Sequence, residues 1–199
     1  MIMFDHIDRF LDIPPWDCVI AGIDPGKKER GITIFIQGEE DSWGNTYDYI
    51  EVAYLRAKYY NLPLVFVMET HTRHGKWGTK QYRGIAEDVG VWKHYIKLVG
   101  EKHKDKKGHL KMVKVNDWRK GVFGYFKRPA FSSKNYWKVK AVEETGIADH
   151  NIAESFLIGL YGTRWDVIGK IRGVEKYDPA MYPEKYEIVN TFEEYVDAQ

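Results

Sequence analysis

Two short apolar stretches, each ending in a single carboxylate, constrain the fold of this chain more than any other feature. Residues 19–23 are followed by Asp24, and residues 64–68 are followed by Glu69. Both stretches are apolar at odd and even positions, which is typical of strands covered by helices on both faces. Because a lone carboxylate is costly to bury, we expect both acids at the carboxyl ends of their strands, facing a crevice. Either acid alone would be interpreted as a turn or cap residue, but the pair predicts a divalent-metal site.

The length and the cysteine content set the broad class. At 199 residues, the chain is long enough for one domain with a substantial core. Its one cysteine, Cys18, excludes an internal disulfide and indicates a reducing compartment. No apolar run approaches the roughly 18 residues of a membrane span. We therefore expect a cytoplasmic protein without membrane contact.

The charge is distributed unevenly along the chain, although the formal net charge is only +1. Residues 71–140 contain 19 Lys and Arg against 5 Asp and Glu, a net charge of +14. The flanking segments, residues 1–70 and 141–199, carry −6 and −7. Solvated lysine faces explain many such runs, but here aromatic residues are interleaved with the basic ones. This combination favours nucleic acid as the partner.

The hydrophobic periodicity predicts a mixed α/β sheet with helices on both sides. We expect strands over residues 18–24, 32–37, 64–69 and 111–115, and helices over 46–60, 80–99, 134–145 and 149–161. Residues 39–45 and 70–78 are expected to be loops. The predicted organisation is a lead-in over residues 1–16, one domain over 17–163, and an acidic C-terminal extension over 164–199 packed on that domain.

A third acid, Glu154, lies in the middle of the last predicted helix. Its neighbours are almost all apolar, and the opposite face of the helix is not polar either. A carboxylate in a buried helix is costly unless it is paired or binds a metal. Asp149 is the predicted N-cap of this helix, and Gly162 its stop.

Four motifs in this order resemble the RuvC-like Holliday junction resolvases of bacteria and their phages, within the RNase H-like nuclease superfamily. They are GIDPG from residue 22, the apolar strand ending in Glu69, VNDWRKGVFG over residues 115–124, and DHNIAES from residue 149. The resemblance covers roughly residues 17–163. It implies an RNase H-like fold, a homodimer and two Mg²⁺ or Mn²⁺ ions per active site. It further implies paired hydrolysis of four-way DNA junctions that leaves 5′-phosphate and 3′-hydroxyl ends.

The resemblance also implies roles for individual residues. Asp24 would hold two ions about 4 Å apart, with Glu69 and the helix acids completing the site. The family pattern offers two helix aspartates three residues apart, whereas this chain has Asn151 and Glu154 at that spacing. We therefore expect Glu154 and Asp149 as the helix acids, with Asn151 and His150 as alternatives to Asp149. The expected DNA-binding residues are Trp77, Arg119, Lys120, Lys134, Lys138 and Lys140.

Other functions remain possible from the sequence. Actin-like ATPases and sugar kinases begin with a similar strand, but their phosphate turns need small hydroxyl residues where this chain has Lys27 and Lys28. Another RNase H-like nuclease, acting on flaps, branched DNA or RNA–DNA hybrids, would share the same acids. A non-catalytic junction-binding protein is a further alternative. The histidines lack the spacing of a zinc site, so none is expected.

Overall fold

The computed structural model describes residues 18–26, 29–36, 39–70, 79–124, 127–130, 133 and 135–162. Their strands are β1 (Val19–Asp24), β2 (Gly31–Ile36), β3 (Glu39–Gly44), β4 (Leu64–Thr70) and β5 (Gly108–Lys114). The helices are α1 (Asp48–Tyr59), α2 (Thr79–Lys102), α3 (Val115–Phe123), α4 (Tyr136–Thr145) and α5 (His150–Gly162). The predicted lead-in and acidic C-terminal extension lie outside the described residues.

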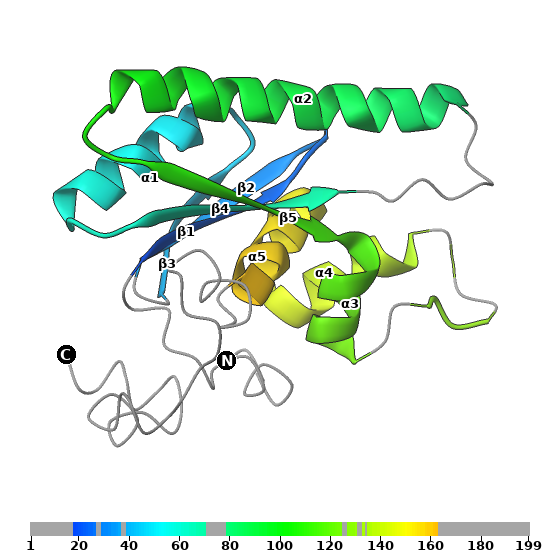
Figure 1. The fold of residues 1–199 in the computed structure, drawn as a ribbon. Coiled ribbons are helices and arrows are strands. Elements are labelled where there is room, and N and C mark those ends of the chain that lie inside the picture. The colour runs from blue at the N-terminus through cyan, green and yellow to red at the C-terminus, as the bar shows by residue number, and fades with distance from the viewer. Residues whose placement is uncertain are drawn as a thin grey trace, which may run out of the picture.

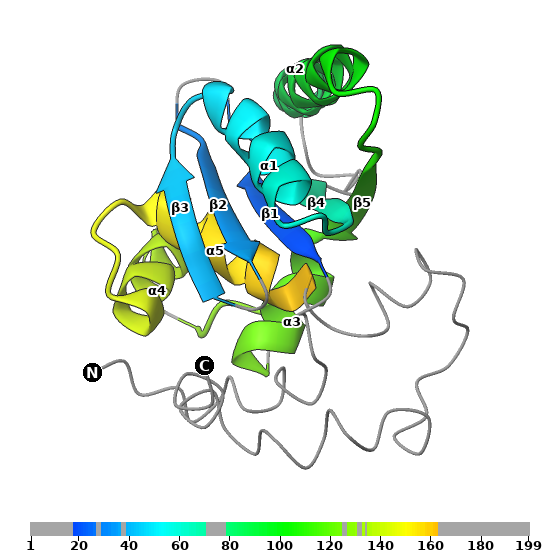
Figure 2. The same ribbon diagram turned by 90° about the vertical axis from the view of Figure 1, so that its left-hand side faces the viewer.

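The five strands form one sheet in the order β3-β2-β1-β4-β5. β1, β2 and β3 pair antiparallel, whereas β1, β4 and β5 run parallel. α1 and α2 cover one face of the sheet, and α3, α4 and α5 lie on the other (Figures 1 and 2). The mixed α/β sheet flanked by helices is thus confirmed.

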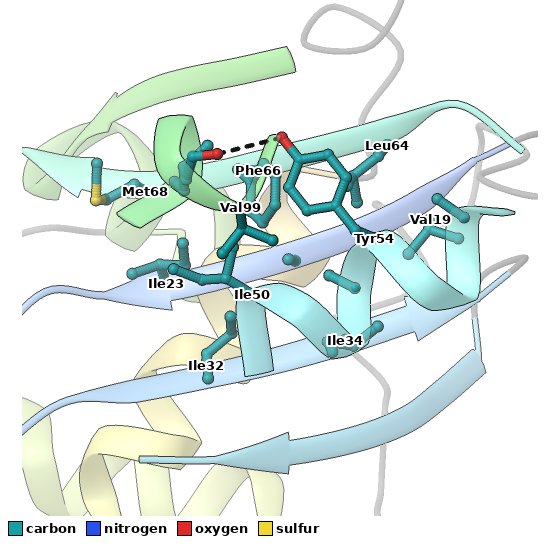
Figure 3. Close-up of a cluster of buried hydrophobic side chains, with 14 of the residues drawn as sticks. Val19, Ile23, Ile32, Ile34, Ile50, Tyr54, Leu64, Phe66, Met68 and Val99 are labelled. Carbon is teal, nitrogen blue, oxygen red and sulfur yellow. Dashed lines mark hydrogen bonds between the residues drawn. The ribbon is translucent and has the colours of Figure 1, made fainter. Parts of the chain in front are cut away.

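The apolar strands at the centre of the sheet contribute to two separate cores because alternate residues point to opposite faces. Val19, Ile23 and Phe66 pack with α1 and α2. Figure 3 shows this core, in which the Tyr54 hydroxyl donates to the Ile96 carbonyl oxygen at 3.4 Å. Residues of the opposite parity, such as Ile20 and Val67, pack with α3, α4 and α5. Burial at both parities is therefore explained by helices on both faces.

Two elements differ from the sequence-based expectation. Residues 39–44, expected to be a loop, form the edge strand β3, whose sequence EEDSWG is mostly polar. Residues 115–123, for which no helix was predicted, form α3 directly after β5. The predicted loop over residues 70–78 lies largely outside the described residues. Among the described helices, none is long and apolar enough to cross a membrane.

At two glycines of the sheet, the backbone of α5 packs directly on the strand backbone with no side chain between them. A Cβ atom on Gly22 of β1 would overlap the Ser155 carbonyl oxygen, and one on Gly31 of β2 would overlap the Asn151 carbonyl oxygen. Glycine at these two positions lets the helix backbone rest on the strand backbones. The Ser155 and Thr33 hydroxyls form a hydrogen bond of 2.8 Å across the same contact. The helix is thereby fixed close to the ends of β1 and β2.

Candidate active site

Asp24 and Glu69 lie side by side at the carboxyl ends of two neighbouring parallel strands. In the register, Ile23 of β1 is opposite Met68 of β4, so the next residue along each strand is one of the acids. Asp24 has the same parity as Ile20, and Glu69 has the same parity as Val67. Both acids therefore point to the face covered by α3, α4 and α5. Their predicted positions at the strand ends are confirmed.

Glu154 reaches the same place from α5. This helix is buried at every residue except His150 and Tyr161, and the Glu154 side chain is only 10% exposed. The Asp24 and Glu154 carboxyls are joined by a hydrogen bond, and the charge of Glu69 acts on both. The predicted buried helix acid thus joins the two strand acids in one cluster, called here the acid cluster: Asp24, Glu69 and Glu154.

The ionised form of the acid cluster is strongly disfavoured. Burial raises the pKa of Asp24 well above its ordinary value, and the neighbouring Glu154 and Glu69 raise it further. Burial, followed by repulsion from Glu69, raises the pKa of Glu154 to about 6. The pKa of Glu69 is also raised by burial. Buried like charges at short range are stabilised either by protons or by a bound cation.

Two neighbouring residues of α3 contact these acids. The Trp118 indole N–H donates to Glu69 Oε2 at 2.6 Å, and the indole is fully buried. A terminal nitrogen of the Arg119 guanidinium lies 3.5 Å from Glu154 Oε1. Both contacts oppose the effect of burial by lowering the pKa of their partner acids. Sequence reasoning did not assign Trp118 to the site, and it placed Arg119 only among phosphate-contacting residues.

The other predicted ligands lie at the start of α5. Asp149 Oδ1 accepts hydrogen bonds from the backbone N–H of Asn151 at 2.8 Å and of Ile152 at 3.3 Å, so Asp149 is the predicted N-cap. The Asn151 side-chain amide also donates to Asp149 Oδ1, at 3.3 Å. The Nε2 atom of His150 lies 3.5 Å from Glu29. Of these three residues, His150 acts on the acid cluster by lowering the pKa of Glu154.

The donors of the acid cluster fit a divalent cation such as Mg²⁺, because all of them are carboxylate oxygens in a buried, negatively charged place. Within the described part of the chain, however, no three His, Cys, Asp or Glu side chains form a preassembled metal-binding group. Hydrogen bonding explains part of this, since Glu69 and Glu154 already have Trp118 and Arg119 as partners. The three acids thus share one site, but their carboxylates are not arranged in the geometry of a complete metal-binding site.

The predicted DNA-binding residues are divided between the site and its surroundings. Lys120 is exposed on α3, next to Arg119. On α4, Lys138 donates to Glu29 at 2.9 Å, and its charge also lowers the pKa of Glu154. Lys140 is paired with Glu144 one turn away. Trp77 and Lys134 lie outside the described residues.

No protein-family model and no curated protein matches this chain. T. thermophilus RuvC in complex with a Holliday junction substrate aligns with it at 13% identity and a TM-score of 0.47, covering 76% of this chain and 96% of that one. Another Thermus thermophilus RuvC structure aligns at 12% identity and a TM-score of 0.46, covering 76% and 97%. The yeast mitochondrial Holliday junction resolvase Ydc2 aligns at 15% identity and a TM-score of 0.41, covering 85% and 87%. All three alignments are remote in sequence, at 12–15% identity.

Proposed function

We propose that this chain is a metal-dependent, structure-specific endodeoxyribonuclease that resolves four-way DNA junctions. The observation that carries the proposal is the convergence of Asp24, Glu69 and Glu154 at one end of the parallel strands. Three carboxylates, of which Glu69 and Glu154 are buried and Asp24 is partly exposed, favour a site for divalent cations over one for a side-chain nucleophile. The net charge of +14 over residues 71–140 supports a polyanionic substrate.

In the proposed mechanism the acid cluster would hold two Mg²⁺ or Mn²⁺ ions, and Asp149 or Asn151 would add a ligand from the first turn of α5. Such ions, when bound, would supply activation of the attacking water and charge stabilisation at the leaving 3′ oxygen, so that hydrolysis would leave 5′-phosphate and 3′-hydroxyl ends. Trp118 keeps the Glu69 carboxylate in place through its indole N–H. Arg119, Lys120, Lys138 and Lys140 are proposed to contact phosphates, together with Trp77 and Lys134.

A homodimer is part of the proposal because two nicks on opposite strands require two sites related by a two-fold axis. α2 offers a surface for it. Val91, Tyr95 and Leu98 are 39%, 36% and 43% exposed and lie on one side of the helix at spacings of four and three residues. Trp92, Ile96 and Val99 occupy the buried side of the same helix. We propose that the exposed stripe packs against a second copy of the chain.

The decisive experiment is cleavage of a synthetic four-way junction with Mg²⁺, beside the same reaction in EDTA. Duplex, flap and RNA–DNA hybrid substrates of matched sequence are the controls. Paired nicks at symmetric positions of the junction, with ends that a DNA ligase can rejoin, are the expected result. Faster cleavage of flaps or hybrids would favour another RNase H-like nuclease. Tight junction binding without cleavage under any metal condition would favour a non-catalytic binding protein.

A further inference from the structure

Arg119 occupies an unusual place for a residue expected to contact DNA. Its side chain is only 18% exposed and lies 3.5 Å from Glu154. Its guanidinium carbon is 5.2 Å from the centre of the Trp118 ring and 4.9 Å from that of Trp137. Two aromatic rings from α3 and α4 thus hold the cation against an acid of α5. Stacking on the two indole rings, called here the indole site, restricts the planar guanidinium to one position much more than it is restricted in an arginine on the protein surface.

The hydrogen-bond donors of the Arg119 guanidinium are not all satisfied by the described residues. Among the described residues, the Arg119 Nε atom is buried without a hydrogen-bond partner. The 3.5 Å contact to Glu154 is longer than a strong charge-assisted hydrogen bond, which is typically about 2.7–2.9 Å. A buried donor without a partner is costly, so a second arrangement that satisfies it is favoured once an acceptor arrives.

The charge of Arg119 acts on the whole acid cluster. It lowers the pKa of Asp24, Glu69 and Glu154, and for both glutamates it is the strongest influence opposing burial. Three acids cannot be neutralised by one guanidinium, which leaves the cluster short of positive charge. A divalent cation would supply that charge but would also be repelled by Arg119.

We propose that Arg119 is an internal counterion that competes with the metal ion for Glu154 and is displaced from it when the metal binds. The inference rests on the proposed function and adds a positioning residue to it. The indole site keeps the displaced guanidinium beside the acid cluster, where its free N–H groups can bind a substrate phosphate. In the metal-free protein Arg119 thereby stabilises the acid cluster, and the consequence is weaker metal binding before DNA is present.

The test is a calorimetric titration of the full chain with Mn²⁺ alone, without DNA, at pH 8. Arg119→Met and Arg119→Gln remove the charge and retain side-chain length. We expect either variant to bind Mn²⁺ about tenfold more tightly than the unmodified chain, the effect of one nearby charge. The matched control is Arg56→Met, which breaks the ion pair of Arg56 in α1 with Asp41 in β3, at a distance from the acid cluster. It should leave the Mn²⁺ affinity within about twofold of the unmodified value.

A second measurement covers the case in which neither Arg119 variant folds. In the unmodified chain labelled with ¹⁵N, the assigned Nε–H resonance of Arg119 should shift on addition of Mg²⁺. An unshifted resonance, or equal or weaker Mn²⁺ binding by a folded Arg119 variant, would overturn the inference and leave the proposed nuclease function intact. Absence of metal binding by both the unmodified chain and the variants would overturn the metal-dependent function, and the inference with it.

Discussion

Replacement of Glu154 by glutamine should make the metal-free protein more stable at neutral pH. The pKa of Glu154 is about 6, compared with 4.5 for an ordinary glutamate, mainly because the side chain is buried. Between these two pH values the folded state holds a proton that the unfolded state releases. The free energy of unfolding therefore falls as the pH rises through this window, by about 2 kcal/mol in total. Glu154→Gln removes this cost while keeping the size of the side chain and an oxygen for Arg119.

The assay is urea unfolding in EDTA at several pH values from 4 to 7.5. The variant should match the unmodified protein near pH 4 and exceed its free energy of unfolding by up to about 2 kcal/mol above pH 7. Glu51→Gln is the control with the opposite sign, because hydrogen bonding to His103 lowers the pKa of Glu51. Its stabilising effect is present above the ordinary pKa and lost as the pH falls, so this variant should be less stable at neutral pH. Parallel curves for the unmodified chain and Glu154→Gln across the range would refute the reasoning.

Three further predictions concern activity and assembly. Asp24→Asn should abolish junction cleavage but leave junction binding unchanged or tighter, because it removes negative charge beside a polyanion; gel-shift and cleavage assays on one preparation check this, and cleavage at the unmodified rate would contradict it. If Asp149 ligates the metal from its N-cap position, Asp149→Asn should lower the cleavage rate more than Asn151→Ala, and the reverse order would show that Asp149 only caps the helix. Leu98→Glu places a charge in the exposed α2 stripe and should therefore convert the dimer into a monomer, as measured by analytical ultracentrifugation. An unchanged sedimentation coefficient would show that the dimer interface does not include this stripe.

The central strands and their acids could be predicted from the sequence because a strand buried on both faces has apolar residues at odd and even positions alike. β1 and β4 are apolar at both parities, and Asp24 and Glu69 interrupt the pattern where each strand ends. Glu154 was predictable for a similar reason, since a charge among apolar residues on every side of a helix is rare. In each of these cases the solvation of the side chain determines the local structure.

The two elements that the sequence did not predict, β3 and α3, lack such a pattern of apolar residues. β3 is an edge strand whose side chains are mostly polar, and backbone hydrogen bonds to β2 hold it in the sheet. α3 follows β5 with no intervening loop: Lys114 is the last strand residue and Val115 the first helical one. The alternation of the strand therefore extends to Val115 and Asn116, which are already helical. Backbone pairing and an abrupt change of dihedral angles are both weakly encoded in side-chain type.

The partners of the acids were beyond sequence reasoning because they depend on the crossing of three helices. Trp118 is spaced like an ordinary core residue of α3, together with Val122. Only the packing of α3 against α5 and β5 brings its indole nitrogen to Glu69. Likewise, Arg119 lies in a basic segment, and nothing in that segment predicts that its guanidinium contacts the rings of two tryptophans. A pattern along the chain reports burial, whereas these contacts are set by tertiary geometry.

The contact of α5 with Gly22 and Gly31 makes the spacing of the acids insensitive to most changes in the core. A layer of interlocking side chains thickens or thins when its residues change, and an element resting on it moves accordingly. Here the peptide groups themselves touch, so their separation is set by atomic radii that every sequence shares. The core on either side can change in composition while Glu154 stays opposite Asp24. A single methyl group at either glycine, in contrast, would act as a wedge under the helix and move one acid away from the other.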